Sequence, residues 1–64
     1  ESVEPEIIRR KTIMIEAMTE TEAIEQMELL GHTFFVYQDP SVGSMVVLYK
    51  RKMGDYGVLV PRLG

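Results

Sequence analysis

Cysteine is absent from the sequence, and histidine occurs once, at His32. Without cysteine, neither a disulfide nor a thiolate metal site can hold the fold together, and a single histidine leaves no pair of imidazoles to share a metal ion. No apolar run approaches the ~20 residues that a membrane span requires. We therefore expect no cofactor, no metal and no membrane association, and the composition fits a reducing, cytoplasmic setting.

Residue arrangements that support catalysis are missing too. The serines, Ser2, Ser41 and Ser44, lie in linker or turn contexts, and none stands in a glycine-framed nucleophile elbow. Neither a phosphate-binding loop nor a dinucleotide-binding fingerprint occurs. His32 follows a glycine that ends the expected helix, so we interpret it as a partner of the helix dipole or a packed loop residue, with a pH-sensitive interface residue as the alternative. We predict that the chain is not an enzyme and has no small-molecule substrate.

The sequence does contain enough apolar residues for a folded domain. Of its 64 residues, 45% are hydrophobic. A domain this short buries only about 60% of the surface that its unfolded chain exposes, so it usually needs a further source of stability. Disulfides and metals are excluded above, which leaves a partner chain as the expected source.

The first half of the chain predicts a linker, a strand and a helix. Residues 1–6 are acidic, contain Pro5 and suggest the end of a linker from a preceding domain. Residues 7–15 are rich in β-branched side chains and predict a first strand. Thr19 and Glu22 have the spacing of a capping box, so a helix is expected from there to about Leu30, with Gly31 ending it.

The second half predicts a three-strand meander. Strands are expected over residues 33–38, 44–51 and 56–60, joined by a four-residue loop at 40–43 and a two-residue loop at Met53 and Gly54. The prediction is therefore an α+β domain over residues 7–61, in the order β-α-β-β-β, with one helix packed on a small, mainly antiparallel sheet. Residues 62–64 are expected to form a tail.

Both faces of the expected meander are apolar. In the register that these loops set, one face carries Phe34, Val36, Val47, Tyr49, Tyr56, Val58 and Val60, and the other carries Phe35, Tyr37, Val46, Leu48 and Leu59. One short helix can cover only one face, and soluble monomers seldom expose a large apolar patch. We assign the second face to a homodimer interface. The residues expected in that interface are Phe34, Val36, Val47, Tyr49, Tyr56 and Val58. The alternative is that a preceding domain covers this face.

Charge suggests a competing function. All basic residues except Arg62 lie in two runs, at residues 9–11 and 50–52, and the net charge is −3. The runs are most simply solvated strand ends. Together with exposed aromatics they could also form an RNA-binding module, although the net negative charge argues against it. A third reading, a ligand-binding regulatory domain of a larger enzyme, rests only on the α+β layout.

Two stretches resemble one known family. Residues 25–37 combine a helix end, Gly31-His32, with the aromatic pair Phe34-Phe35, and residues 49–59 form a Tyr-basic-basic hairpin. In combination these stretches, and residues 5–61 as a whole, resemble the C-terminal domain of long-form ribosome hibernation promoting factors and their cyanobacterial and plastid relatives. The sequence departs from the usual pattern in its two turns, at residues 39–43 and at Met53.

The resemblance implies a parent protein of two domains. Its N-terminal domain would occupy the small ribosomal subunit, where mRNA and tRNA bind, and its C-terminal domain, resembled here, would associate with a second copy. Two ribosomes would thereby be joined into an inactive pair, silencing translation under stress or in stationary phase. The expected partners are a second copy of the chain and, through the missing domain, the ribosome. The expected location is the cytoplasm, or the plastid stroma for a plastid relative.

Overall fold

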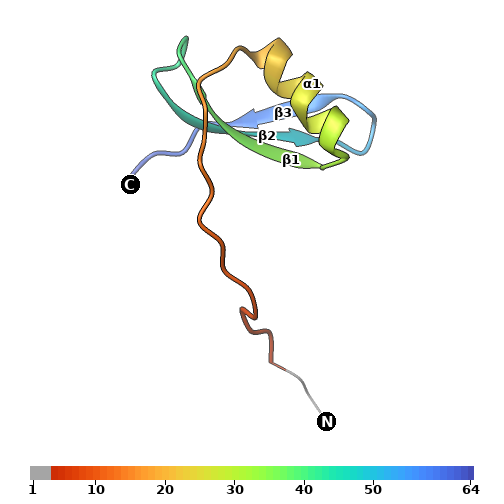
Figure 1. Ribbon diagram of the computed structural model, residues 1–64, viewed down its shortest axis with the longest axis vertical. Coiled ribbons are helices and arrows are strands. Elements are labelled where there is room, and N and C mark those ends of the chain that lie inside the picture. Colours follow the sequence, from red (N-terminus) through yellow and green to blue (C-terminus); the bar gives the residue numbers. More distant parts are fainter. Residues whose placement is uncertain (1–3) are drawn as a thin grey trace.

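The computed structural model describes residues 4–64 and has two layers, one helix packed on an antiparallel sheet. The elements are α1 (Glu20–Leu30), β1 (Phe34–Asp39), β2 (Ser44–Lys50) and β3 (Tyr56–Leu59), with the strands in the order β1-β2-β3 (Figure 1). The predicted α+β class is confirmed. Residues 1–3, half of the expected linker, lie outside the described residues.

Helix α1 begins and ends as its sequence predicts. The Thr19 side chain accepts a hydrogen bond from the Glu22 backbone N–H at 3.2 Å, and the Glu22 carboxylate accepts one from the Thr19 N–H at 2.9 Å, so the capping box is complete. At the other end, Gly31 adopts a left-handed conformation with φ of 71°. The N–H groups of Gly31 and His32 then donate to the carbonyls of Glu28 and Met27, which is a Schellman motif.

The first hairpin has the predicted register. Asp39 pairs with Ser44, leaving a four-residue loop, and the ladder runs back to the pair Phe34 and Tyr49. Asp39 is only 2% exposed and organises the turn, because its carboxylate accepts hydrogen bonds from the backbone N–H and the hydroxyl of Ser41, at 3.0 and 2.8 Å. This local bonding holds the turn, and the Tyr37 hydroxyl, which also donates to Asp39, connects it with the core.

The second hairpin differs from its prediction by one residue. Lys50 pairs with Tyr56, and the Arg51 N–H donates to the Asp55 carbonyl, so the loop has three residues instead of two. Gly54, with φ of 92°, supplies the left-handed position that closes such a loop. Because side chains alternate along a strand, this shift exchanges the two faces of β3.

The core lies between α1 and one face of the sheet. Ala23 and Met27 of α1 pack against the buried side chains Tyr37, Val46 and Leu48. Phe35 and Ile24 flank this cluster. The helix-facing positions predicted on β1 and β2 are therefore confirmed, and Leu30 at the end of α1 is exposed.

The predicted first strand is not formed. Residues 7–15 are extended but assigned to no strand, and their apolar side chains are exposed, Ile8 by 86% and Met14 by 92%. The chain first meets the sheet at an isolated parallel bridge between Ala17 and Gln38. Strand propensity expresses how well a residue fits a pleated sheet, and it cannot supply the neighbouring strand that residues 7–15 lack here.

Candidate functional site

The candidate site is the sheet face opposite α1, which we call the open face. It is built from two cross-strand pairs on β1 and β2, Phe34 with Tyr49 and Val36 with Val47. Figure 1 shows α1 lying over one side of the sheet, and no other helix or strand of residues 4–64 covers the second side. The four residues predicted at the centre of an interface therefore share one face, as expected.

The open face exposes large apolar side chains. Phe34 is 60% exposed, and Val36, Val47 and Tyr49 are half-buried. Met45 and Leu59 also lie on this face, although the sequence did not predict them there. Their side chains are 42% and 57% exposed. Met45 lies two residues before Val47, so strand alternation could have found it. Leu59 pairs with Val47 and was missed because of the one-residue shift in the second hairpin.

Tyr49 has a fixed place on this face. It pairs with Gly57 of β3, and a Cβ built on Gly57 would fall within 2.8 Å of Tyr49 Cε1. The tyrosine ring therefore lies over the glycine, using the space that a side chain would otherwise fill. Such cover by an aromatic residue compensates for a glycine in a strand and presents one side of the ring to the open face.

Two residues predicted for the interface belong to the other face. Val58 pairs with Leu48, and Tyr56 pairs with Lys50, so both point to the side that carries α1. The Tyr56 hydroxyl donates to the Glu28 carboxylate of α1, which also forms an ion pair of 3.1 Å with Lys50. The assignment of Tyr56 and Val58 to the open face is wrong, because the second loop has three residues.

Glu28 joins the helix to both strands of the second hairpin, to Lys50 of β2 and Tyr56 of β3. The hydrogen bonds from Tyr56 and Lys50 hold the pKa of Glu28 below its ordinary value. The hydrogen bond between Tyr56 and Glu28 also raises the pKa of Tyr56. Burial and the nearby carboxylates of Asp39 and Glu20 raise the pKa of Tyr37. These interactions connect structural elements on the helix side and leave the open face uncharged.

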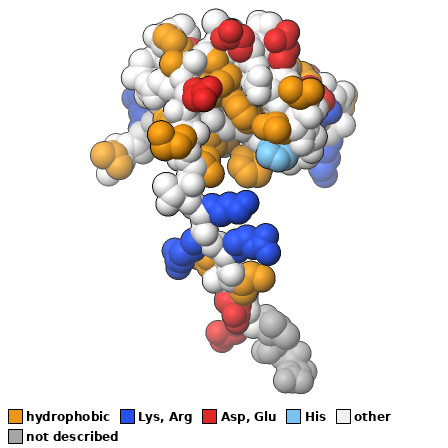
Figure 2. All heavy atoms as spheres, in the orientation of Figure 1, with side chains coloured by type: hydrophobic (Ala, Val, Ile, Leu, Met, Phe, Trp, Pro, Cys, Tyr) orange, Lys and Arg blue, Asp and Glu red, His pale blue; other side chains and the backbone are white. Residues whose placement is uncertain are grey.

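The two basic runs occupy different settings. Within the second run, Lys50 is paired with Glu28 and Arg51 with Asp55 at 3.4 Å, which places these charges in local ion pairs. The first run, residues 9–11, lies on the exposed extended segment, where blue side chains gather below the packed domain in Figure 2. His32 is exposed at the surface, so it is not a packed loop residue.

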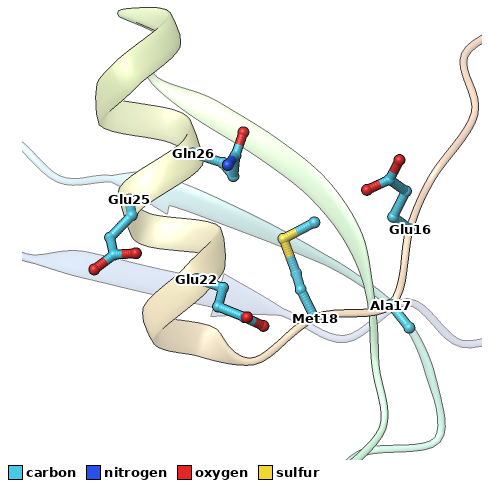
Figure 3. Close-up of a pocket in the computed structure, with 6 residues that line it drawn as sticks. All are labelled: Glu16, Ala17, Met18, Glu22, Glu25 and Gln26. Carbon is cyan, nitrogen blue, oxygen red and sulfur yellow. The ribbon is translucent and has the colours of Figure 1, made fainter.

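The hollow beside the start of α1 offers no constellation for catalysis. The hollow in Figure 3 lies between α1 and the approaching chain, and Glu16, Glu22, Glu25, Gln26, Ala17 and Met18 line it. These residues include neither a nucleophile nor a basic partner. Among residues 4–64 no group of three or more histidine or acidic side chains could hold a metal ion. No helix in this part of the chain is long and apolar enough to cross a membrane.

Fold and surface together define a small α+β module whose distinctive feature is an apolar sheet face. Residues 2–58 match the family model for the Sigma 54 modulation/S30EA ribosomal protein C terminus. The chain belongs to this family. It is 39% identical over 59 residues to the chloroplastic ribosome-binding factor PSRP1 of Spinacia oleracea. That match covers 92% of this chain and 20% of the spinach protein, so the chain spans about a fifth of its relative's length.

Proposed function

We propose that the open face is a homodimer interface and that the chain joins two copies of its parent protein. The observation that carries this proposal is the continuous apolar surface made by Phe34, Val36, Val47, Tyr49 and Leu59 on the sheet face away from α1. A face of this kind is uncommon on a soluble monomer. Packed against a second sheet at a spacing of about 10 Å, it would become the interior of a sandwich.

A second copy suits this face better than an unrelated partner does. Two-fold dimers place the same patch on both subunits, so an uncharged, apolar face is complementary to itself without matching charges. The fold also has few other sources of stability, because the fully buried hydrophobic cluster within residues 4–64 has five members, from Ala23 to Leu48. Burial of the open face would add to the stability of both copies.

Membership of the family supports a proposal for the biological role. The spinach relative is named as a ribosome-binding factor. We propose that the parent of this chain binds the ribosome through a preceding domain, and that pairing of two open faces joins two ribosomes into an inactive pair. This activity would contribute to translational silencing under stress or in stationary phase. The proposed compartment is the cytoplasm, or the plastid stroma for a plastid protein.

Sedimentation equilibrium of the 64-residue chain tests the proposal. At micromolar concentration the expected mass is twice the 7.3 kDa of one chain, and the thermal midpoint should rise with protein concentration because dimer stability follows mass action. A mass of one chain at 100 μM, with a thermal midpoint independent of concentration, would contradict it. Light scattering of purified ribosomes mixed with the full-length parent extends the test to ribosome pairing.

A further inference from the structure

The extended segment before the bridge, residues 7–15, has the composition of a strand but no strand beside it. Ile7, Ile8 and Ile13 are largely exposed, although β-branched residues favour the pleated surface of a sheet. The three basic residues between them do not exclude a strand, because charged side chains are typical of strands at a sheet edge. The segment therefore has solvent-exposed backbone groups that a sheet edge could pair, and exposed apolar side chains that it could partly cover.

Strand β1 provides a free edge of the matching kind. It is the outermost strand, and Gln38 uses its outward backbone groups in hydrogen bonds of 3.1 and 3.0 Å with Met18 and Glu16. Outward groups recur at every second residue of an edge strand. The N–H and C=O groups of Val36 and Phe34 therefore point outward as well, and residues 4–64 supply no partner for them.

A hollow lies beside this unpaired stretch of β1. Phe35 and Val36 line it from the strand, Met18 and Gln26 from the helix side, and Ile13 and Met14 from the departing segment. The segment thus borders the edge without filling the place of a fourth strand. A strand laid in this hollow would complete the ladder that Ala17 and Gln38 begin.

The direction of the segment favours exchange with a second copy. Figure 1 shows residues 4–15 passing the edge of the sheet and continuing away on the side of the open face. Two sheets packed through that face would be about 10 Å apart, a distance that three extended residues span. If residues 13–15 cross between the sheets, residues 7–12 remain to pair with the second copy, and six residues is a typical strand length.

We propose that, in the dimer, residues 7–12 of each copy form an edge strand on β1 of the other, paired with the outward groups of Phe34 and Val36. This inference rests on the proposed dimerisation through the open face and adds a second, reciprocal contact to it. Each sheet would then have four strands, the fourth supplied by the partner. The exchange also places the basic residues 9–11 along the outer edge of the dimer.

Proline substitutions test the proposed strand. Ile8→Pro and Arg9→Pro each remove one backbone N–H, and in a paired edge strand only one of two consecutive N–H groups faces the neighbour. We expect one of the two variants to raise the dissociation constant at least about tenfold more than the other. Glu4→Pro, upstream of the segment, is the matched control and should leave the dissociation constant unchanged. Neither variant should change the monomer's circular dichroism, because the segment is unpaired in one copy.

Mixed-chain relaxation measurements identify which copy supplies the strand. Since the chain has no cysteine, Ile8→Cys carries a nitroxide at one defined position. A chain without isotope label that carries this nitroxide is mixed with a nitrogen-15-labelled chain without it. In the mixed dimer the nitroxide should broaden the amide signals of Phe34 and Val36 of the labelled chain. Broadening only when both labels share one chain would overturn the exchange in favour of pairing within one copy.

The test separates the two proposals. If the chain is monomeric, both the open-face dimer and the strand exchange are contradicted. A dimer that dissociates on Phe34→Ala, but is insensitive to both prolines and shows no broadening between chains, keeps the open-face interface and overturns the exchange. Slow amide hydrogen exchange at Val36 in the dimer, which becomes fast in the sensitive proline variant, would support the strand exchange between copies.

Discussion

The ring of Tyr49 lies over the α-carbon of Gly57 on the neighbouring strand, so that a Cβ at Gly57 would meet the ring within 2.8 Å. The aromatic ring and the missing side chain therefore depend on each other. This relationship holds Tyr49 flat against β3 at the edge of the open face, and it connects the stability of the sheet with the shape of the proposed interface.

Gly57→Ala should destabilise the domain by about 1–3 kcal/mol, the usual cost of inserting a carbon into a filled site. The added Cβ would displace the ring of Tyr49. Chemical denaturation of both single variants and of the double variant with Tyr49→Ala gives the coupling between them. In the Tyr49→Ala background the glycine substitution should cost much less. Equal costs in both backgrounds would show that the ring does not occupy this space.

Phe34→Ala should weaken self-association by about 2–4 kcal/mol, which corresponds to roughly a 30- to 1000-fold rise in the dissociation constant. Phe34 is the most exposed aromatic residue of the open face, and it pairs there with Tyr49. Leu29→Ala is the control, because Leu29 is also exposed but lies on α1. Sedimentation should show loss of the dimer for the first variant alone. In the parent protein, Phe34→Ala should abolish ribosome pairing and retain binding to single ribosomes.

Thr19→Ala should cost about 1 kcal/mol of stability, the typical loss when an N-cap acceptor is removed. The variant leaves the Glu22 N–H without its acceptor. Thr21→Ala, two residues into the same helix, keeps the cap and should be close to neutral. Thermal unfolding at a fixed protein concentration measures both, and equal midpoints for Thr19→Ala and the wild type would contradict the capping role.

The contact of Glu28 with Tyr56 and Lys50 should make stability depend on pH. The pKa of Glu28 is lowered in the fold by these two hydrogen bonds, so its contribution is complete above the ordinary value of 4.5 and is lost as pH falls through the lower folded value. The pKa of Tyr56 is raised, so its contribution is present below its ordinary value of 10.0 and is lost as pH rises through the folded value.

Glu28→Gln isolates the acidic part of this dependence. Above pH 4.5 the wild type should have the higher thermal midpoint, and the difference should shrink as the carboxylate is protonated. Glu25→Gln is the control, because Glu25 lies on the same helix and has no hydrogen bond to the strands among the described residues. A difference that stays constant between pH 3 and 7 would show that the charge of Glu28 does not contribute.

Local signals in the sequence predicted the helix and the first hairpin correctly. The capping box at Thr19, the glycine at position 31 and the turn chemistry around Asp39 each depend on residues close in sequence, and the structure has all three. The alternation of β1 and β2 then placed Phe34, Val36, Val47 and Tyr49 together. These positions need only the pleat and a correct loop length.

The errors arose where the deciding information was not local. A two-residue and a three-residue loop both suit Met53 and Gly54, and the choice of the longer loop moved Tyr56 and Val58 to the helix face and Leu59 to the open face. The expected strand at residues 7–15 failed for another reason. Its side chains favour a sheet, but within residues 4–64 the segment passes the edge of β1 without pairing with it, and contact begins only at Glu16 and Ala17.

The separation of the core from the open face bears on how the proposed pairing would be controlled. The fully buried side chains lie between α1 and the sheet, so a single copy keeps its interior when the opposite face is uncovered. Association through that face would thus be a reversible equilibrium between folded species. The number of pairs would then rise with the square of the free chain's concentration at low occupancy, and synthesis or proteolysis of the factor would act as a steep control on ribosome pairing.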